Sequence, residues 1–375
     1  MNKLEAVIVA CDMVTSYGTG INACWNGMLS GRTAVSRLRR FNTSAFQSGY
    51  AAAVEGLKYL KGDSLVMQMF GLLFENNSFS APEDAKFILA TTKGEIDLLE
   101  EKFLTGKGDS GKSNPLHLLK KLSTLAGVSD SGIIISTACA SSSAALAQAA
   151  SMIKNGRSDC VLVAACDGVT EFIYSGFSSL MALDKSAASP FDKERSGLSL
   201  GEAAAYALVM SESRAKKEKR KIIGRIAGWG LSNDASHMTG PSRTSDGLIR
   251  AVNKALNSAC IGEGSIGFIS AHGTGTVYND AMEMRAFHSV FKKKIPVYSV
   301  KGAIGHTLGA AGLVETIIAL KALEEKTVPL TVNLKTADYD AEGWVSRNPH
   351  TLAGKQTALI TNAGFSGINT ALVVE

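Results

Sequence analysis

The stretch Ser136-Thr137-Ala138-Cys139-Ala140-Ser141-Ser142-Ser143 is the most informative part of this chain, because a strand-like and a helix-like sequence pattern meet in it. The β-branched run 132–136 predicts a strand, and the alanine-rich segment 140–155 predicts a helix. Cys139 would lie on a sharp turn at the helix N-terminus, where the helix dipole favours thiolate over thiol. Small neighbours would leave the sulfur accessible to a substrate. On these residues alone, a nucleophile and a buried cysteine at a helix start fit equally well.

Strand-like and helix-like segments alternate along the whole chain. The predicted helices are 140–155, 246–260, 281–291 and 312–325, and the predicted strands are 6–10, 87–91, 132–136, 160–165, 203–210, 222–229, 266–271, 296–300, 357–361 and 370–374. Several strands are continuous apolar runs, which is typical of strands buried on both faces, so the interleaving predicts an α/β fold. A strand, turn and helix pattern occurs in both parts of the chain and predicts two similar halves, 1–210 and 211–375.

Composition bounds the class of protein. The chain has 375 residues, 45% of them hydrophobic, enough to bury a large core and to exclude a disordered protein. No apolar run reaches the ~18 residues of a membrane-spanning helix, and the short apolar stretch 6–10 predicts a strand, not a signal peptide. Six scattered cysteines without a CxxC pair predict reduced thiols in a cytoplasmic protein, with no metal site.

The charge balance is modest: 39 Lys+Arg and 34 Asp+Glu give a formal net charge of +5. Basic residues gather at 37–40, 214–225 and 292–294. Each cluster fits either a solvated surface or a docking site for an acidic partner. Aromatic residues are sparse and no nucleic-acid-binding motif occurs, so we expect no nucleic-acid partner.

Two further segments place histidines in glycine-rich turns. In Ser270-Ala271-His272-Gly273-Thr274-Gly275-Thr276, a predicted strand delivers a histidine and two threonine hydroxyls to one turn. Asp280 and Glu283 begin the next helix, where carboxylates complement the helix dipole, and this role alone would explain Asp280. In the segment 300–312, Lys301 ends a predicted strand and His306 follows in a glycine-rich loop that lacks the ending of a phosphate-binding P-loop.

The last segment, Thr361-Asn362-Ala363-Gly364-Phe365-Ser366-Gly367-Ile368-Asn369, predicts two strands joined by a turn with Phe365 at its tip. A plain hairpin would explain it equally well. One cysteine, two histidines and one lysine nevertheless all fall at strand ends or glycine-rich turns, where sites of α/β sheets form. Together they favour a cysteine acyl-transfer site over four unrelated turns.

In this order, the four segments resemble the β-ketoacyl-acyl-carrier-protein synthases of the Cys-His-His type. The motif Ser189-Pro190-Phe191-Asp192 and the loop 234–241 extend the resemblance over nearly the whole chain. The resemblance implies the thiolase-like fold, in which two duplicated α/β halves form five layers (αβαβα). It also implies a dimer, made of two copies or of this chain and another synthase-like chain.

The resemblance implies the following chemistry. Cys139 takes an acyl group from an acyl carrier protein, and the backbone N–H groups of Cys139 and Phe365 form the oxyanion hole. His272 and His306, both neutral, donate hydrogen bonds to the carbonyl of malonyl-carrier protein and stabilise the enolate that decarboxylation leaves. Lys301 orients His272, with Glu283 as its ionic partner and Asp280 in support.

The remaining implied roles concern substrate binding. Thr274 and Thr276 match positions that bind the phosphopantetheine arm, and Gly364, Phe365 and Ser366 form a gate. Lys93 falls where relatives line the acyl tunnel with small apolar residues. The enzyme itself needs no cofactor, because the carrier protein brings the phosphopantetheine.

Two departures from the family pattern point to a specialised synthase, for example one that makes a polyene. The gate reads Gly-Phe-Ser-Gly-Ile-Asn where the family has Gly-Phe-Gly-Gly-Thr-Asn, and Lys93 would place a charge beside an apolar chain. The alternatives are a chain-length-setting subunit of a heterodimer, disfavoured by the intact Cys139, and a thiolase that uses coenzyme A. A thiolase needs a second catalytic cysteine, and no cysteine follows Cys260. A cysteine hydrolase lacks a distinct base to activate water.

Overall fold

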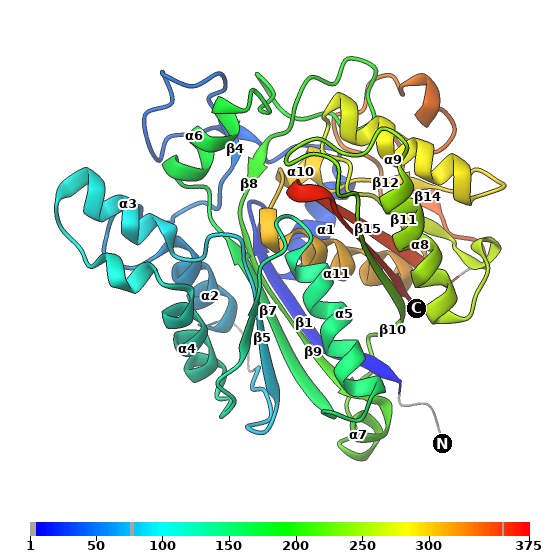
Figure 1. The fold of residues 1–375 in the computed structure, drawn as a ribbon, viewed down its shortest axis with the longest axis horizontal. Helices are drawn as coiled ribbons and strands as arrows, with labels where there is room; N and C mark the ends of the chain where they lie inside the picture. Colours follow the sequence, from blue (N-terminus) through cyan, green and yellow to red (C-terminus); the bar gives the residue numbers. More distant parts are fainter. Residues whose placement is uncertain (1–4, 76–78, 355) are drawn as a thin grey trace.

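The computed structural model describes residues 5–75, 79–354 and 356–375, and its main feature is one long sheet (Figure 1). The strands of this sheet are β1 (Ala6–Thr15), β2 (Gly18–Thr19), β5 (Lys86–Ala90), β6 (Ile133–Ile135), β7 (Cys160–Asp167), β9 (Ala203–Ser211), β10 (Gly224–Asn233), β11 (Phe268–Ser270), β12 (Val297–Tyr298), β15 (Ala358–Gly364) and β16 (Ile368–Val374). Their order is β12-β11-β15-β16-β10-β1-β9-β7-β5-β6, with β2 beside β1.

The sheet consists of two halves with the same strand arrangement. In each half, the first strand in the chain (β1 or β10) lies at the centre of the sheet, followed outward by the fifth, fourth, second and third. The two innermost pairings of each half are antiparallel and the two outermost are parallel. The halves join where β1 pairs with β10. This repeated order supports the two duplicated halves that the sequence predicted.

Helices fill the space between the halves and cover their outer faces. The central helices α5 (Ser141–Lys154) and α11 (Ala311–Glu324) pack on each other and on strands of both halves. Almost every residue of α11 is buried, as expected for a helix that is apolar all round. The outer helices are α2 (Leu65–Glu75) and α4 (Pro115–Ala126) on the first half, and α8 (Asp246–Ala259) and α9 (Val277–Val290) on the second. The five-layer fold is therefore confirmed.

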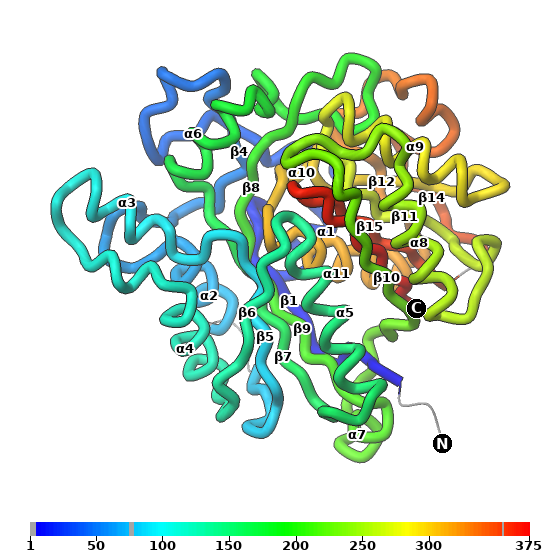
Figure 2. The backbone as a smooth tube through the Cα atoms, viewed as in Figure 1, coloured from blue at the N-terminus to red at the C-terminus, as the bar shows by residue number. Residues whose placement is uncertain are grey.

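Shorter elements connect and flank the strands and helices of these layers (Figure 2). They are α1 (Ile21–Leu29), α3 (Ile96–Thr105), α6 (Glu171–Ser179), α7 (Glu212–Lys217), α10 (Lys301–Ile304), β3 (Ser36–Arg37), β4 (Tyr50–Ala52), β8 (Leu200–Gly201), β13 (Thr327–Val328) and β14 (His350–Thr351). Every strand and helix predicted from the sequence pattern is present, with bounds shifted by a few residues. One detail was wrong: Lys301 begins α10 and does not end a strand.

Two further findings concern what this part of the chain lacks. Across residues 5–75, 79–354 and 356–375, no helix has the length and apolar character needed to cross a bilayer. Within the same ranges, no three His, Cys, Asp or Glu side chains come together as a potential metal site.

Candidate active site

Cys139 lies on a strained turn between β6 and α5. Ala138, just before it, has φ of 49°, in the left-handed region that residues with a Cβ rarely adopt. The hydroxyl of Ser141 stabilises the turn, because it accepts a hydrogen bond from Thr137 N–H at 2.9 Å and donates one to the Ala138 carbonyl. The turn thus presents the sulfur just ahead of the first helical residue, as the sequence predicted.

The predicted thiolate, however, is wrong for the resting protein. Cys139 is only 6% exposed, and this burial raises the pKa of its thiol to about 12. The positive charge of Lys301 lowers the pKa, and the carboxylates of Asp167 and Glu315 raise it, but burial has the largest effect. Burial of the anion therefore favours the thiol in the resting protein, and the thiol loses its proton as it reacts.

His272 follows β11 and is fixed by a buried carboxylate. Glu283, on α9, accepts hydrogen bonds from the backbone N–H of His272 at 2.7 Å and of Gly273 at 2.6 Å. Burial, followed by the charge of Lys301 and the neighbouring His306, lowers the pKa of His272 well below its ordinary value. The imidazole is therefore neutral at physiological pH, as predicted.

His306 lies in the turn between α10 and α11, with its ring against that of His272. The two ring centroids are 5.1 Å apart and the rings are nearly perpendicular, at 88°. Burial and Lys301 lower the pKa of His306 well below its ordinary value. Neither ring nitrogen of His306 has a hydrogen-bond partner among the described residues, although both are buried. Since His306 lines the cavity, its ring has unused hydrogen-bonding capacity beside the space for a substrate.

The predicted ionic partner of Lys301 is wrong. Lys301 Nζ forms a buried salt bridge with Glu315 on α11 and donates a hydrogen bond to the backbone carbonyl of His272. Glu283 instead uses its oxygens on backbone N–H groups and on the side chains of Thr361 and Asn279. Glu315 is a single carboxylate in the middle of an apolar helix, and this was the sequence signal that the prediction overlooked.

Asp280 supports the histidine turn from outside the cavity. Its carboxylate accepts hydrogen bonds from the backbone N–H of Phe191 at 2.8 Å and of Gly275 at 3.2 Å. Arg195 Nε lies 3.7 Å from the same carboxylate. Burial, with the nearby Asp280, raises the pKa of Glu283 to about 7. The two carboxylates therefore fix the backbone around His272 and do more than cap α9.

These side chains meet at a cavity of about 470 Å³. Seven of the predicted residues line it, namely Cys139, His272, Thr274, Thr276, His306, Gly364 and Phe365. Residues that the prediction did not assign also line it, including Phe177, Leu180, Met181 and Leu198, and so does His237 of the loop 234–241 that carries the family resemblance. Ser366 and Lys93 are not among its lining residues, and both side chains are exposed. The interpretation of Lys93 as an acyl-binding residue therefore gains no support in this chain alone.

Two residues of the predicted gate, Gly364 and Phe365, line one side of the cavity. A Cβ at Gly364 would lie 3.3 Å from Cys139 N and 3.1 Å from the Thr137 carbonyl, so the end of β15 contacts the nucleophile turn closely. The ring of Phe365 stacks on Phe177 of α6, with centroids 5.7 Å apart. Ser366, which replaces a glycine of the family pattern, has φ of 68° and so adopts a conformation that glycine favours.

Comparison with known proteins shows which family this chain belongs to. The models "Beta-ketoacyl synthase, N-terminal domain" and "Beta-ketoacyl synthase, C-terminal domain" match residues 121–215 and 223–335. A 3-oxoacyl-[acyl-carrier-protein] synthase homolog of Saccharomyces cerevisiae is 32% identical over 305 residues, 75% of this chain and 68% of that protein. This chain belongs to the β-ketoacyl synthase family.

Other relatives of this β-ketoacyl synthase match it from end to end. The 3-oxoacyl-[acyl-carrier-protein] synthase 2 of Vibrio cholerae is 29% identical, over 100% of this chain and 99% of that protein. A type II polyketide ketosynthase, solved with its acyl-carrier protein and bound to a hexaketide, has a TM-score of 0.90 at 27% identity and full coverage of both chains. The ishigamide ketosynthase/chain length factor has a TM-score of 0.88 at 26% identity, covering 99% of each chain. The chain is thus a condensing acyltransferase of fatty acid or type II polyketide synthesis.

Proposed function

We propose that this synthase transfers an acyl group from a carrier protein to Cys139 and condenses it with malonyl-carrier protein. The observation that carries the proposal is the common cavity of Cys139 and two neutral histidines. In the first step, the Cys139 sulfur attacks the thioester carbonyl. The carrier's pantetheine sulfur leaves and takes up the proton that the Cys139 thiol releases. The backbone N–H groups of Cys139 and Phe365 stabilise the negative oxygen.

In the second step, malonyl-carrier protein loses carbon dioxide, and the electron pair of the broken C–C bond forms an enolate. His272 and His306 donate hydrogen bonds to the enolate oxygen, for which each needs an N–H and no positive charge. The enolate carbon attacks the acyl-Cys139 carbonyl, and the cysteine sulfur leaves as a thiolate that takes a proton from water. The product is the 3-oxoacyl-carrier protein. Thr274 and Thr276, whose hydroxyls lie 2.9 Å apart at the cavity wall, bind the pantetheine arm.

The experiment incubates the purified protein with malonyl-carrier protein and a panel of acyl-carrier proteins, and measures carbon dioxide and 3-oxoacyl product by mass spectrometry. We expect both products, and an acyl adduct on Cys139 when malonyl-carrier protein is omitted. A protein that forms neither adduct nor product would contradict the proposal. A panel that includes unsaturated chains also tests the specialised pathway, because only some chains should be accepted.

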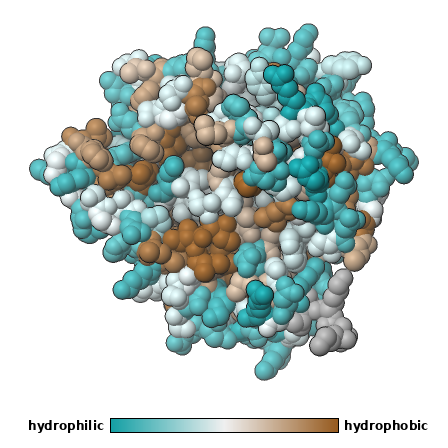
Figure 3. Space-filling model, in the orientation of Figure 1, coloured by the Kyte–Doolittle hydropathy of each residue, from teal (hydrophilic) through white to brown (hydrophobic). Residues whose placement is uncertain are grey.

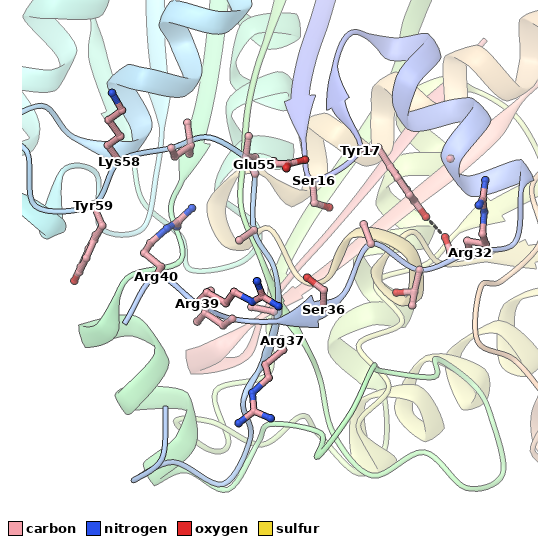
Figure 4. A pocket seen from close by; sticks show the side chains of 18 of the residues that line it. Ser16, Tyr17, Arg32, Ser36, Arg37, Arg39, Arg40, Glu55, Lys58 and Tyr59 are labelled. Atoms are coloured by element: carbon pink, nitrogen blue, oxygen red, sulfur yellow. Dashed lines mark hydrogen bonds between the residues drawn. The ribbon is translucent and has the colours of Figure 1, made fainter. Parts of the chain in front are cut away.

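The carrier protein docks on a basic groove of about 1050 Å³ (Figure 4). Five exposed cations define this basic groove: Arg32, Arg37, Arg39, Lys58 and Lys61. None of the five forms an ion pair within the described part of the chain, so their charge is free for an acidic surface. Leu38 lines the basic groove and packs in the same apolar cluster as Leu198, which lines the cavity.

The contacts of individual side chains distinguish the three basic clusters that the sequence analysis named as candidate docking sites. Arg40 lines the basic groove but adds no free charge to it, because its side chain is 7% exposed and forms a bidentate ion pair with Glu202. In the second cluster, Arg214 is already paired with Asp84, Asp159 and Glu218. We choose the basic groove for the acidic carrier because it borders the apolar cluster beside the cavity.

A second synthase-like chain pairs with the edge strand β6. This strand pairs with β5 on one side and is the last strand of the sheet (Figure 2). Strand β6 consists of three isoleucines, of which Ile133 is 47% exposed. The molecular surface over this strand is apolar in Figure 3. Such an edge needs a partner, because its backbone groups are free to pair. The related ketosynthase/chain length factor supports a heterodimer, and the intact Cys139 favours the catalytic role in it.

Two experiments test the role of β6 and distinguish a homodimer from a heterodimer. We expect Ile133→Lys to convert the assembly to a monomer in sedimentation experiments, whether the partner is a copy or another chain. Activity that appears only when a second synthase-like chain is added would identify a heterodimer. A dimer that persists in the variant would contradict the role of β6. The division at 210/211 and the cytoplasmic location stay predictions.

A further inference from the structure

Asn362, near the end of β15, is a buried amide that the sequence analysis did not assign to any role. Its side chain lies where three elements meet: Ser143 on α5, Glu315 on α11 and His272 after β11. Asn362 is fully buried and does not line the cavity, so it cannot touch a substrate there. Its effect must act through its neighbours.

The surroundings fix which way the amide points. Asn362 Nδ2 lies 2.6 Å from Glu315 Oε2, and Glu315 Oε1 is paired with Lys301. A carboxylate oxygen only accepts hydrogen bonds, so the amide nitrogen must face it and the amide oxygen must face away. On the other side, the Ser143 hydroxyl donates to Asn362 Oδ1. A flipped amide would place two oxygens against each other beside Glu315.

This orientation decides the proton position on His272. Asn362 Nδ2 carries a second hydrogen, and His272 Nδ1 lies 3.4 Å from it. An amide nitrogen donates and does not accept, so Nδ1 must be the unprotonated nitrogen of a neutral ring. The distance is at the long end of the hydrogen-bond range. The proton of the neutral ring is then on Nε2.

We propose that Asn362 is a positioning residue that holds His272 as its Nε2–H tautomer. The tautomer is a property of the free protein, whereas its effect on condensation rests on the proposed function. His306 offers an internal contrast, because neither of its ring nitrogens has a partner in the described part of the chain. A change at Asn362 should therefore alter His272 and leave His306 unchanged.

The experiment measures histidine ring nitrogens by NMR in protein labelled with ¹⁵N-histidine. The signals of His272 are assigned as those lost in His272→Gln. In the wild-type protein we expect Nε2 protonated and Nδ1 unprotonated. In Asn362→Asp, an acceptor replaces the donor at Nδ1, so His272 should carry a proton on Nδ1 and become protonated at a higher pH.

Kinetics separate this role from simple structural damage. In Asn362→Asp we expect condensation to fall by about 10²-fold, the loss typical of one hydrogen-bond donor to a developing oxyanion, whereas acylation of Cys139 changes far less. Asn333→Asp is the matched control, because Asn333 donates to the carbonyls of Ala188 and Gly302 and does not contact a histidine. It should leave the His272 signals and the ratio of the two steps unchanged.

Three results would overturn the proposal: a wild-type His272 protonated on Nδ1, an unchanged tautomer in Asn362→Asp, or an equal loss of acylation and condensation. If Asn362→Asp does not fold, Asn362→Ala tests the same point, because it removes the donor without adding a charge and should give a mixture of tautomers. A protein that shows the expected tautomer but forms no 3-oxoacyl product would contradict the proposed function and not this inference.

Discussion

The cavity of Cys139 and the basic groove are both rich in ionisable side chains, but these side chains differ in burial and in pairing. Around the cavity, Lys301 is buried and paired with Glu315, and the histidines are neutral. In the basic groove, five cations are exposed and unpaired within the described residues. The first arrangement holds fixed dipoles and charges where a transition state develops charge. The second attracts a partner from a distance and is screened by salt.

The largest effect should come from the nucleophile. Cys139→Ala should lower condensation by at least ~10⁴-fold, because no acyl-enzyme can form. Product formation and the acyl adduct are both measured by mass spectrometry. Cys260→Ala serves as the control, since Cys260 is exposed at the end of α8 and outside the cavity. Full activity in Cys139→Ala would show that another group carries the acyl chain.

Breaking the buried ion pair should have the next largest effect. Glu315→Gln leaves the buried Lys301 without its counter-charge, which should cost about 3–5 kcal/mol in the free energy of unfolding. Replacing both residues by methionine should recover much of this stability but not the activity. Glu325→Gln, which removes an exposed partner of Lys321, should cost less than ~1 kcal/mol. Chemical denaturation measures all three, and equal losses in the two single variants would contradict the difference between buried and exposed pairs.

The pH dependence of the two steps should differ. Because burial raises the pKa of Cys139 to about 12, its alkylation by iodoacetamide should rise about tenfold per pH unit between pH 6 and 9. The pKa values of the histidines are lowered, so these residues stay neutral as the pH falls to 6. Condensation from the pre-formed acyl-enzyme should therefore be nearly constant over this range. A plateau in alkylation near pH 7 would mean that the cavity stabilises the thiolate.

The smallest effect should come from the basic groove. Reversing two charges, in Arg37→Glu/Arg39→Glu, should raise the KM for carrier-bound substrates about fivefold to tenfold at low salt and leave kcat unchanged. The difference should disappear above ~0.5 M salt. The matched control is Lys292→Glu/Lys293→Glu, which changes the same net charge at the third basic cluster. If both double variants behave alike, only the total charge matters.

Much of the fold and the site could be predicted because the relevant signals are local. Cys139 and His272 each follow a strand, His306 follows the short helix α10, and all three lie in turns of small residues that line one cavity. The pairing of Lys301 depends on which helix fills the centre, and no local pattern contains that information. The raised pKa of Cys139 depends on burial by segments far apart in sequence, which the local pattern at the start of α5 does not contain.

The matching strand orders of the two halves have a consequence for where Cys139 and His306 lie. In each half, the third strand leads toward a helix of the central layer: β6 to α5 through Cys139, and β12 through α10 to α11 through His306. The nucleophile and this histidine thus occupy corresponding turns of a duplicated unit. Equivalent positions of the two halves therefore line one cavity, where one position holds a thiol and the other a neutral imidazole.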